Sequence, residues 1–104
     1  MDDELLELKE DFEYEIKKRM LFWQDRRIDT RGISSGVDAY TPKKVSGWIN
    51  SAKSRPKFDQ VMNELGAQDT VEAVFVDPKF ETLSRQWPAA RLKAQGRLDG
   101  SVSD

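Results

Sequence analysis

Few residues of this chain could perform chemistry, and their types exclude most catalytic designs. The 104 residues include no histidine and no cysteine. This removes the usual general base near neutral pH, Ser–His and Cys–His nucleophile pairs, thiolate metal sites and disulfides. No phosphate-binding glycine loop occurs, and the aspartates of residues 28–40 lack the spacing of a calcium loop. We therefore expect no enzyme activity, no cofactor, no metal and no small-molecule substrate.

Two groups of residues still share features with parts of catalytic sites. Ser54 and Lys57 match the pattern Ser-x-x-Lys, but a proline interrupts it. The serine acyl-transferases that use this pattern also need further motifs and a much larger cleft. The paired carboxylates, such as Glu13 and Glu15, are expected on an exposed helix face, where water solvates them. Neither group predicts catalysis.

Charge is the strongest positive signal in the sequence. Residues 1–15 hold eight acids and one base, a net charge of −7, whereas residues 17–57 hold eleven bases and three acids, a net charge of +8. This asymmetry predicts either attraction between the two regions within the fold or binding to charged partners. The candidate contacts for nucleic acid or an acidic partner are Arg26, Arg27, Arg31, Lys43, Lys44, Lys53, Arg55 and Lys57.

Many of these bases flank a predicted pair of short helices within residues 41–66. Thr41 and Pro42 form a helix start, and Ser54 is expected to cap the second helix, which Gly66 ends. The predicted inward residues are Val45, Trp48, Ile49 and Ala52 in the first helix (42–53), and Phe58, Val61, Met62 and Leu65 in the second. The pair has the size of a helix–turn–helix unit that could enter a major groove. A turn that ends at a proline, few base-reading side chains and a pI of about 5.2 argue against that use.

The N-terminal segment is predicted to form one long amphipathic helix over residues 2–27. Its apolar face comprises Leu5, Leu8, Phe12, Ile16, Met20 and Trp23. Further apolar residues broaden this face near its end, so the helix is expected to bury that end in its own core or to share it with a second chain. The candidate protein-interface residues are Leu21, Phe22, Trp23, Leu92 and Leu98.

The remaining segments complete an expected all-α single domain. Residues 28–40 have the Gly, Ser and Asp content of a connector, and residues 41–87 are expected to be a helical core of three to four short helices. Within that core, Val71–Val76 fits either a helix or a strand, with the helix favoured by a preceding Asp-x-x-Glu start. A helix over 78–87 is expected to end at Pro88, and residues 88–104 are expected to be an extended or disordered tail.

These features favour a non-catalytic interaction protein that acts as an adaptor, assembly subunit or inhibitor within a larger protein complex, as small phage or accessory proteins do. Its expected partner is another protein or a second copy of itself. The alternative is a nucleic-acid-binding regulator that uses residues 41–66. Because no apolar run approaches the roughly 20 residues that span a bilayer, no membrane partner is expected. We expect a cytoplasmic location or a place in a soluble particle or virion, without a recognisable secretion signal.

Overall fold

The computed structural model describes residues 3–34, 36 and 39–101, and in these residues it contains helices and no strands. This confirms the all-α prediction with a long first helix. The helices are α1 (Asp3–Asp25), α2 (Pro42–Asn50), α3 (Ser54–Glu64), the 3₁₀ turn η1 (Ala67–Asp69), α4 (Val71–Val76), the 3₁₀ turn η2 (Pro78–Phe80), α5 (Glu81–Ser84) and α6 (Pro88–Asp99). Asp2, Val37, Asp38 and residues 102–104, which the predictions included, lie outside the described residues.

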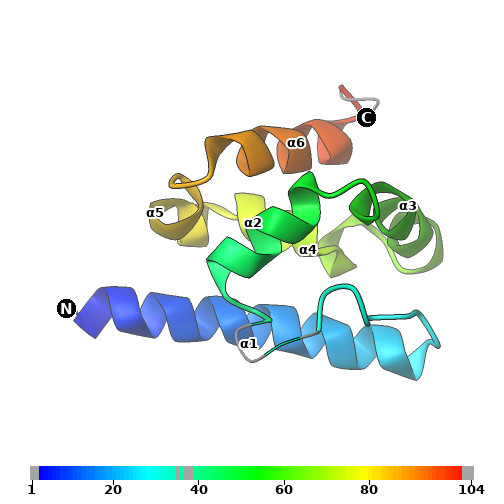
Figure 1. Cartoon of the computed structure of the whole chain (residues 1–104), viewed down its shortest axis with the longest axis horizontal. Coiled ribbons are helices and arrows are strands. Elements are labelled where there is room, and N and C mark those ends of the chain that lie inside the picture. Colours follow the sequence, from blue (N-terminus) through cyan, green and yellow to red (C-terminus); the bar gives the residue numbers. More distant parts are fainter. Residues whose placement is uncertain (1–2, 35, 37–38, 102–104) are drawn as a thin grey trace.

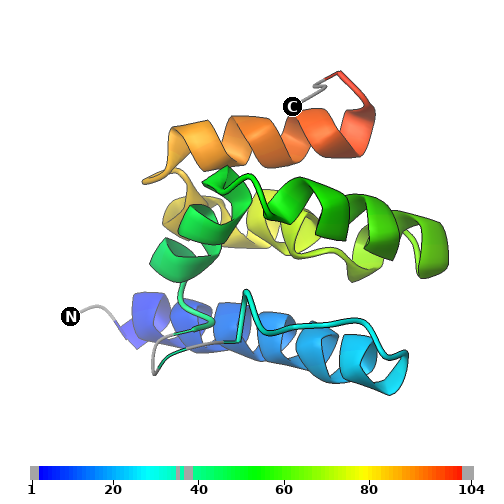
Figure 2. The same ribbon diagram turned by 45° about the vertical axis from the view of Figure 1, so that its right-hand side comes forward.

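The helices form three layers, which Figures 1 and 2 show from two directions. Helix α1 is one outer layer and α6 is the other. The short α4 lies between them and packs against α1, α2 and α6, with its most extensive contact to α6. The centre of the domain is therefore α4, the segment whose sequence left helix and strand open, rather than the 41–66 helix pair.

Helix α1 buries the predicted stripe against α4 and α2. Phe12, Ile16, Met20 and Trp23 are all at most 1% exposed. The ring of Phe12 meets Phe75 and Phe80 edge to face, at centroid distances of 6.2 and 5.3 Å. Such edge-to-face contacts add to the stabilisation from apolar burial. The long helix thus packs against the core along this face.

The start of α2 agrees with the prediction, whereas the start of α3 does not. Thr41 caps α2, because its side-chain oxygen accepts a hydrogen bond from the backbone N–H of Lys44 at 3.4 Å, and Pro42 occupies the first turn. Ser54 is not a cap. It is the first residue of α3, and its buried hydroxyl shares its proton between the carbonyl oxygens of Ile49 (2.9 Å) and Ser51 (2.8 Å). Its side chain therefore stabilises the turn before α3 and does not cap α3 itself.

Helix α4 confirms the favoured helical prediction with the expected bounds, but its capping residue differs from the expected one. The cap is Thr70, whose hydroxyl oxygen accepts from the N–H of Ala73 at 3.1 Å. Asp69 is therefore not the first member of a capping box. The side chain of Glu72, predicted to complete that box, is instead buried. Its carboxylate points to the outer layer formed by α6, where it pairs with Arg97.

The largest correction concerns the C-terminal segment. Residues 88–99 form helix α6 instead of an extended or disordered tail. Pro88 stands in the first turn of this helix, where proline is well tolerated, and Gly100 ends it in the left-handed conformation with φ 77°. The residues that α6 buries are Ala90, Ala94, Gly96 and Arg97. Small side chains let the backbone of α6 approach α4 closely, so this helix needs no stripe of large apolar residues.

A buried ion pair joins the central layer to α6. The Nη1 of Arg97 donates to Oε2 of Glu72 at 2.9 Å and to Oγ of Ser54 at 2.9 Å. The side chains of Arg97 and Glu72 are 1% and 2% exposed. A buried charge is strongly unfavourable without a partner, so this network ties the positions of α3, α4 and α6 together.

Candidate functional site

An open basic groove beside Trp48 is the most developed candidate site of the described residues. It has a volume of about 840 Å³ and lies between the turn of residues 31–32, helix α2 and the turn before α3. Its lining residues are Arg31, Gly32, Lys44, Gly47, Trp48, Ser51, Ala52 and Lys53. Three of the eight predicted basic contacts, Arg31, Lys44 and Lys53, therefore meet here around one half-buried indole.

Two glycines shape this groove. A Cβ on Gly32 would lie 2.5 Å from Cζ3 of Trp48, so only glycine lets the loop backbone approach one side of the indole. A Cβ on Gly47 would meet no atom within 4 Å. Gly47 therefore leaves open space next to the indole, although glycine weakens a helix interior by about 1 kcal/mol. The groove was not predicted. Trp48, expected to face inward, is half-buried and packs against the core, whereas Ala52, also expected to face inward, is exposed.

The position of Arg31 is set by Asp29. The Asp29 carboxylate accepts hydrogen bonds from Nε of Arg31 (3.1 Å to each oxygen), from Nη2 (2.9 Å) and from the backbone N–H (3.0 Å). These bonds, with a smaller contribution from the charge of Lys57, lower the pKa of Asp29 to about 2. Arg31 is thus oriented at the edge of the groove, but much of its charge is compensated by Asp29.

The other five predicted basic contacts lie elsewhere. Lys43 lines a separate groove of about 270 Å³ with Leu5, Lys9 and Trp87 among its neighbours. On α3, Arg55 pairs with Asp59 at 3.1 Å, and Lys57 donates to Gln60 at 3.2 Å. Beyond the end of α1, Arg26 lies over the Phe22 ring at 5.1 Å, and Arg27 is exposed with φ 60°.

The predicted apolar interface residues do not form one surface. Trp23 is 1% exposed, and its indole N–H donates to the carbonyl oxygen of Asp69 at 2.8 Å, so it belongs to the core. Leu21 is 57% exposed on α1, and Phe22 beside it is half-buried. Leu92 is 72% exposed on α6, and Leu98 is half-buried there. Because α1 and α6 are opposite layers (Figure 1), Leu21 and Leu92 cannot meet the same small partner surface.

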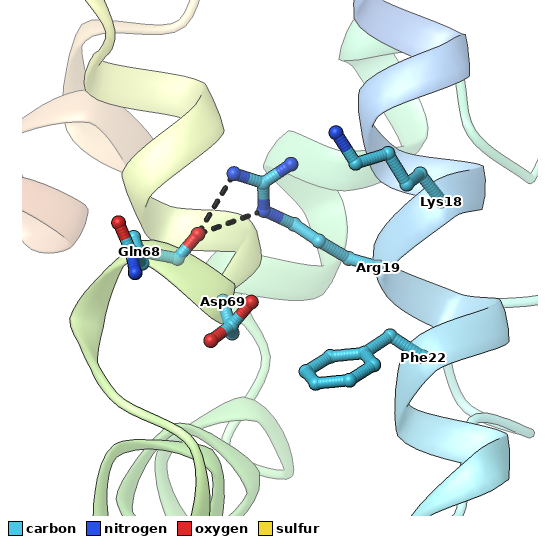
Figure 3. Close-up of a pocket in the computed structure, with 5 residues that line it drawn as sticks. All are labelled: Lys18, Arg19, Phe22, Gln68 and Asp69. Carbon is cyan, nitrogen blue, oxygen red and sulfur yellow. Dashed lines mark hydrogen bonds between the residues drawn. The ribbon is translucent and has the colours of Figure 1, made fainter.

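A second pocket, of about 410 Å³, lies where α1 meets η1 (Figure 3). Arg19 reaches across it and donates to the Gln68 carbonyl oxygen from both Nε (3.1 Å) and Nη2 (2.7 Å), while Nη1 pairs with Glu15 at 2.8 Å. Phe22 lies beside this clamp, and Lys18 lies along the same side of α1. The Arg19 guanidinium is already bonded to Gln68 and Glu15 within the fold, so we interpret this pocket as part of the structural contact between α1 and η1.

The chemistry available at the Trp48 groove is binding. Lysines and an arginine supply charge for carboxylates or phosphates, and an indole face supplies apolar area and a stacking surface. Among the described residues, no three His, Cys, Asp or Glu side chains gather in a way that could hold a metal ion. In the same ranges, no helix combines the length and apolar character needed to cross a bilayer.

Comparison with known proteins gives no relative from which a function could be transferred. No protein-family model, curated protein or solved structure matches the chain.

Proposed function

We propose that this chain is a non-catalytic interaction protein, an adaptor, assembly subunit or inhibitor in a larger protein complex, and that it binds an acidic segment of its partner in the Trp48 groove. The observation that carries the proposal is the convergence of Arg31, Lys44 and Lys53 on one half-buried indole. Aromatic and arginine residues in a concave surface are the usual anchors of protein interfaces.

The charge of the groove favours an acidic protein segment over duplex nucleic acid. Among the residues that the structure describes, no acidic side chain lines the groove, so the groove attracts anions. Asp29 compensates Arg31, however, and the main uncompensated charges are those of two lysines. Nucleic-acid-binding surfaces commonly carry a wide basic stripe that neutralises many phosphates.

A second candidate function, binding of single-stranded nucleic acid, is favoured by one observation. A half-buried tryptophan beside lysines can stack a base while the lysines contact phosphates. This candidate uses the same groove, so the two functions differ in ligand and in salt dependence, not in location.

The two candidates separate in a titration with two labelled probes, an oligoglutamate peptide and an oligothymidine strand, each at low and at moderate salt. We expect the peptide to bind more tightly than the strand. A tighter strand whose affinity falls steeply with salt would favour the nucleic-acid function. If neither probe binds at low salt, the groove is not a site for anionic partners.

Two adjacent lysines offer a matched pair of variants. Lys44→Glu places an acid in the Trp48 groove, whereas Lys43→Glu makes the same charge change one residue away, in the separate groove that Lys43 lines. We expect Lys44→Glu to weaken peptide binding about tenfold more than Lys43→Glu, because a like charge in the site replaces an attractive contact. Equal losses would mean that overall charge, rather than the groove, attracts the peptide.

A further inference from the structure

The outer face of α1 carries a second apolar stripe, separate from the one in the core. Leu6, Tyr14 and Leu21 are 45%, 62% and 57% exposed, and they are three of the four large exposed hydrophobic residues in the described part of the chain. At 100° per residue they fall within about 80° of one another around the helix, on the side away from the buried stripe.

Charged residues of opposite sign divide this stripe. Glu10 lies on the same face between Leu6 and Tyr14, and Lys17 lies on it between Tyr14 and Leu21. Glu10, Tyr14 and Lys17 also line one shallow groove of about 380 Å³, with Glu13 and Tyr40. From the N-terminal end, this face therefore carries Leu6, Glu10, Tyr14, Lys17 and Leu21. We call this face the outer stripe.

The outer stripe is complementary to itself when the second helix runs in the opposite direction. Turning one copy about a two-fold axis near Tyr14 places Leu6 opposite the Leu21 of the second copy, and Glu10 opposite its Lys17. A parallel arrangement would place Glu10 against Glu10 and Lys17 against Lys17, which is repulsive. Self-complementarity of one surface under a two-fold rotation is the requirement for an isologous dimer.

We infer that the outer stripe is a self-association surface, on which two copies of this chain pair α1 against α1 in antiparallel orientation. The acidic and basic halves of the helix then face each other, which gives the charge asymmetry of the sequence a role between chains. Only three large apolar side chains per copy take part, so the dimer is a reversible one of small area. This surface is separate from the Trp48 groove, so each proposal can fail without the other.

Charge variants test the surface and its orientation together, with sedimentation equilibrium as the measurement. Glu10→Lys or Lys17→Glu should each weaken the dimer by roughly tenfold, because two-fold symmetry repeats the altered contact. The double swap Glu10→Lys with Lys17→Glu should restore association, since each new charge again faces its opposite. A wild-type chain that stays monomeric up to a concentration on the order of 1 mM would overturn the proposal and would leave the stripe to a partner of different sequence.

Apolar variants have a matched control on the opposite layer. Leu21→Ser should weaken the dimer, whereas Leu92→Ser, at a still more exposed leucine on α6, should leave it unchanged. Far-UV circular dichroism would show that both variants keep the fold. Equal behaviour of the two variants would contradict the assignment of the outer stripe, as would a dimer unaffected by Lys17→Glu. Lys44→Glu should not alter the dimer, which separates this test from that of the groove.

The register can be tested directly, because the chain has no native cysteine. Mixing Leu6→Cys with Leu21→Cys should give a disulfide between the two variants under mild oxidation. Leu21→Cys alone should not cross-link, because antiparallel pairing places the two copies of position 21 about 22 Å apart along the axis, beyond the roughly 7 Å limit for a disulfide. Cross-linking of Leu21→Cys with itself, and not with Leu6→Cys, would refute the antiparallel register.

Discussion

Replacing Arg97 by methionine should be among the most destabilising single substitutions in this chain, although Arg97 lies in a segment with few large apolar residues. The change keeps an unbranched, apolar stem but removes the guanidinium that meets Glu72 and Ser54 at 2.9 Å. The carboxylate of Glu72 stays in the core without that cation. The Ser54 hydroxyl keeps its bonds to main-chain carbonyls.

The magnitude follows from the burial of both partners. Exposures of 1% and 2% leave almost no water to solvate a remaining charge. Removing one member of a buried ion pair costs about 3–5 kcal/mol, because the other charge keeps its desolvation cost and loses that contact. In a domain of about 100 residues this lowers the midpoint of thermal unfolding by roughly 12–20 °C. By contrast, the pair of Arg55 and Asp59, whose side chains are 30% and 53% exposed, should contribute less than about 1 kcal/mol.

The assay is urea and thermal unfolding followed by circular dichroism for a double-mutant cycle. The cycle comprises wild type, Arg97→Met, Glu72→Leu and the double variant. We expect each single variant to be strongly destabilised and the double variant to regain most of the loss, since an apolar pair can replace a buried ion pair at little cost. A loss below about 1 kcal/mol for Arg97→Met, or a double variant as unstable as the sum of the singles, would refute the role assigned to the pair.

Three further predictions concern the Trp48 groove and its edge. Gly47→Ala should raise the free energy of unfolding by about 1 kcal/mol, because the new methyl group meets open space in a helix interior. Gly32→Ala should lower the free energy of unfolding, because its methyl group would displace the indole of Trp48. Chemical denaturation measures both changes. An NMR pH titration should give Asp29 a pKa of about 2, and Arg31→Ala should return it towards the ordinary value of 3.8. Because folding lowers this pKa, the stabilisation from the Asp29–Arg31 pair is complete above about pH 4 and is lost as the pH falls towards 2. Solvent exposure keeps the size of this stabilisation small. If Arg31→Ala left the pKa of Asp29 unchanged, the pair would not be the cause of the shift.

Part of the candidate site could be predicted from the sequence and part could not. The basic composition of residues 17–57 singled out Arg31, Lys44 and Lys53, but it could not separate them from Lys43 or Arg55. Which of these bases line the groove depends on the side of α2 or α3 from which each side chain projects. It also depends on the close approach of the 31–32 turn to Trp48. Gly47, next to Trp48 in the sequence, was the one local sign of open space beside the indole.

The sequence by itself determined the elements whose signals are local. Helix α1, of 23 residues, has a continuous stripe from Leu5 to Trp23, and the start of α2 has a cap followed by proline. Gly66, with φ 119°, occupies the left-handed backbone region that glycine adopts readily. These features depend on neighbours three or four residues away, and a sequence pattern records them directly.

Only the tertiary structure decided the centre of the domain and the fate of its last helix. Helix α4 is six residues long, too short for its period to exclude a strand. Helix α6 buries alanines, a glycine and an arginine. A segment with so few large apolar residues was predicted to be an extended or disordered tail. Its stability comes from close approach to α4 and from the pairing of Arg97 with a glutamate 25 residues earlier. A charge becomes a core residue only when its partner is brought to it, and that is a property of the fold, not of the local sequence.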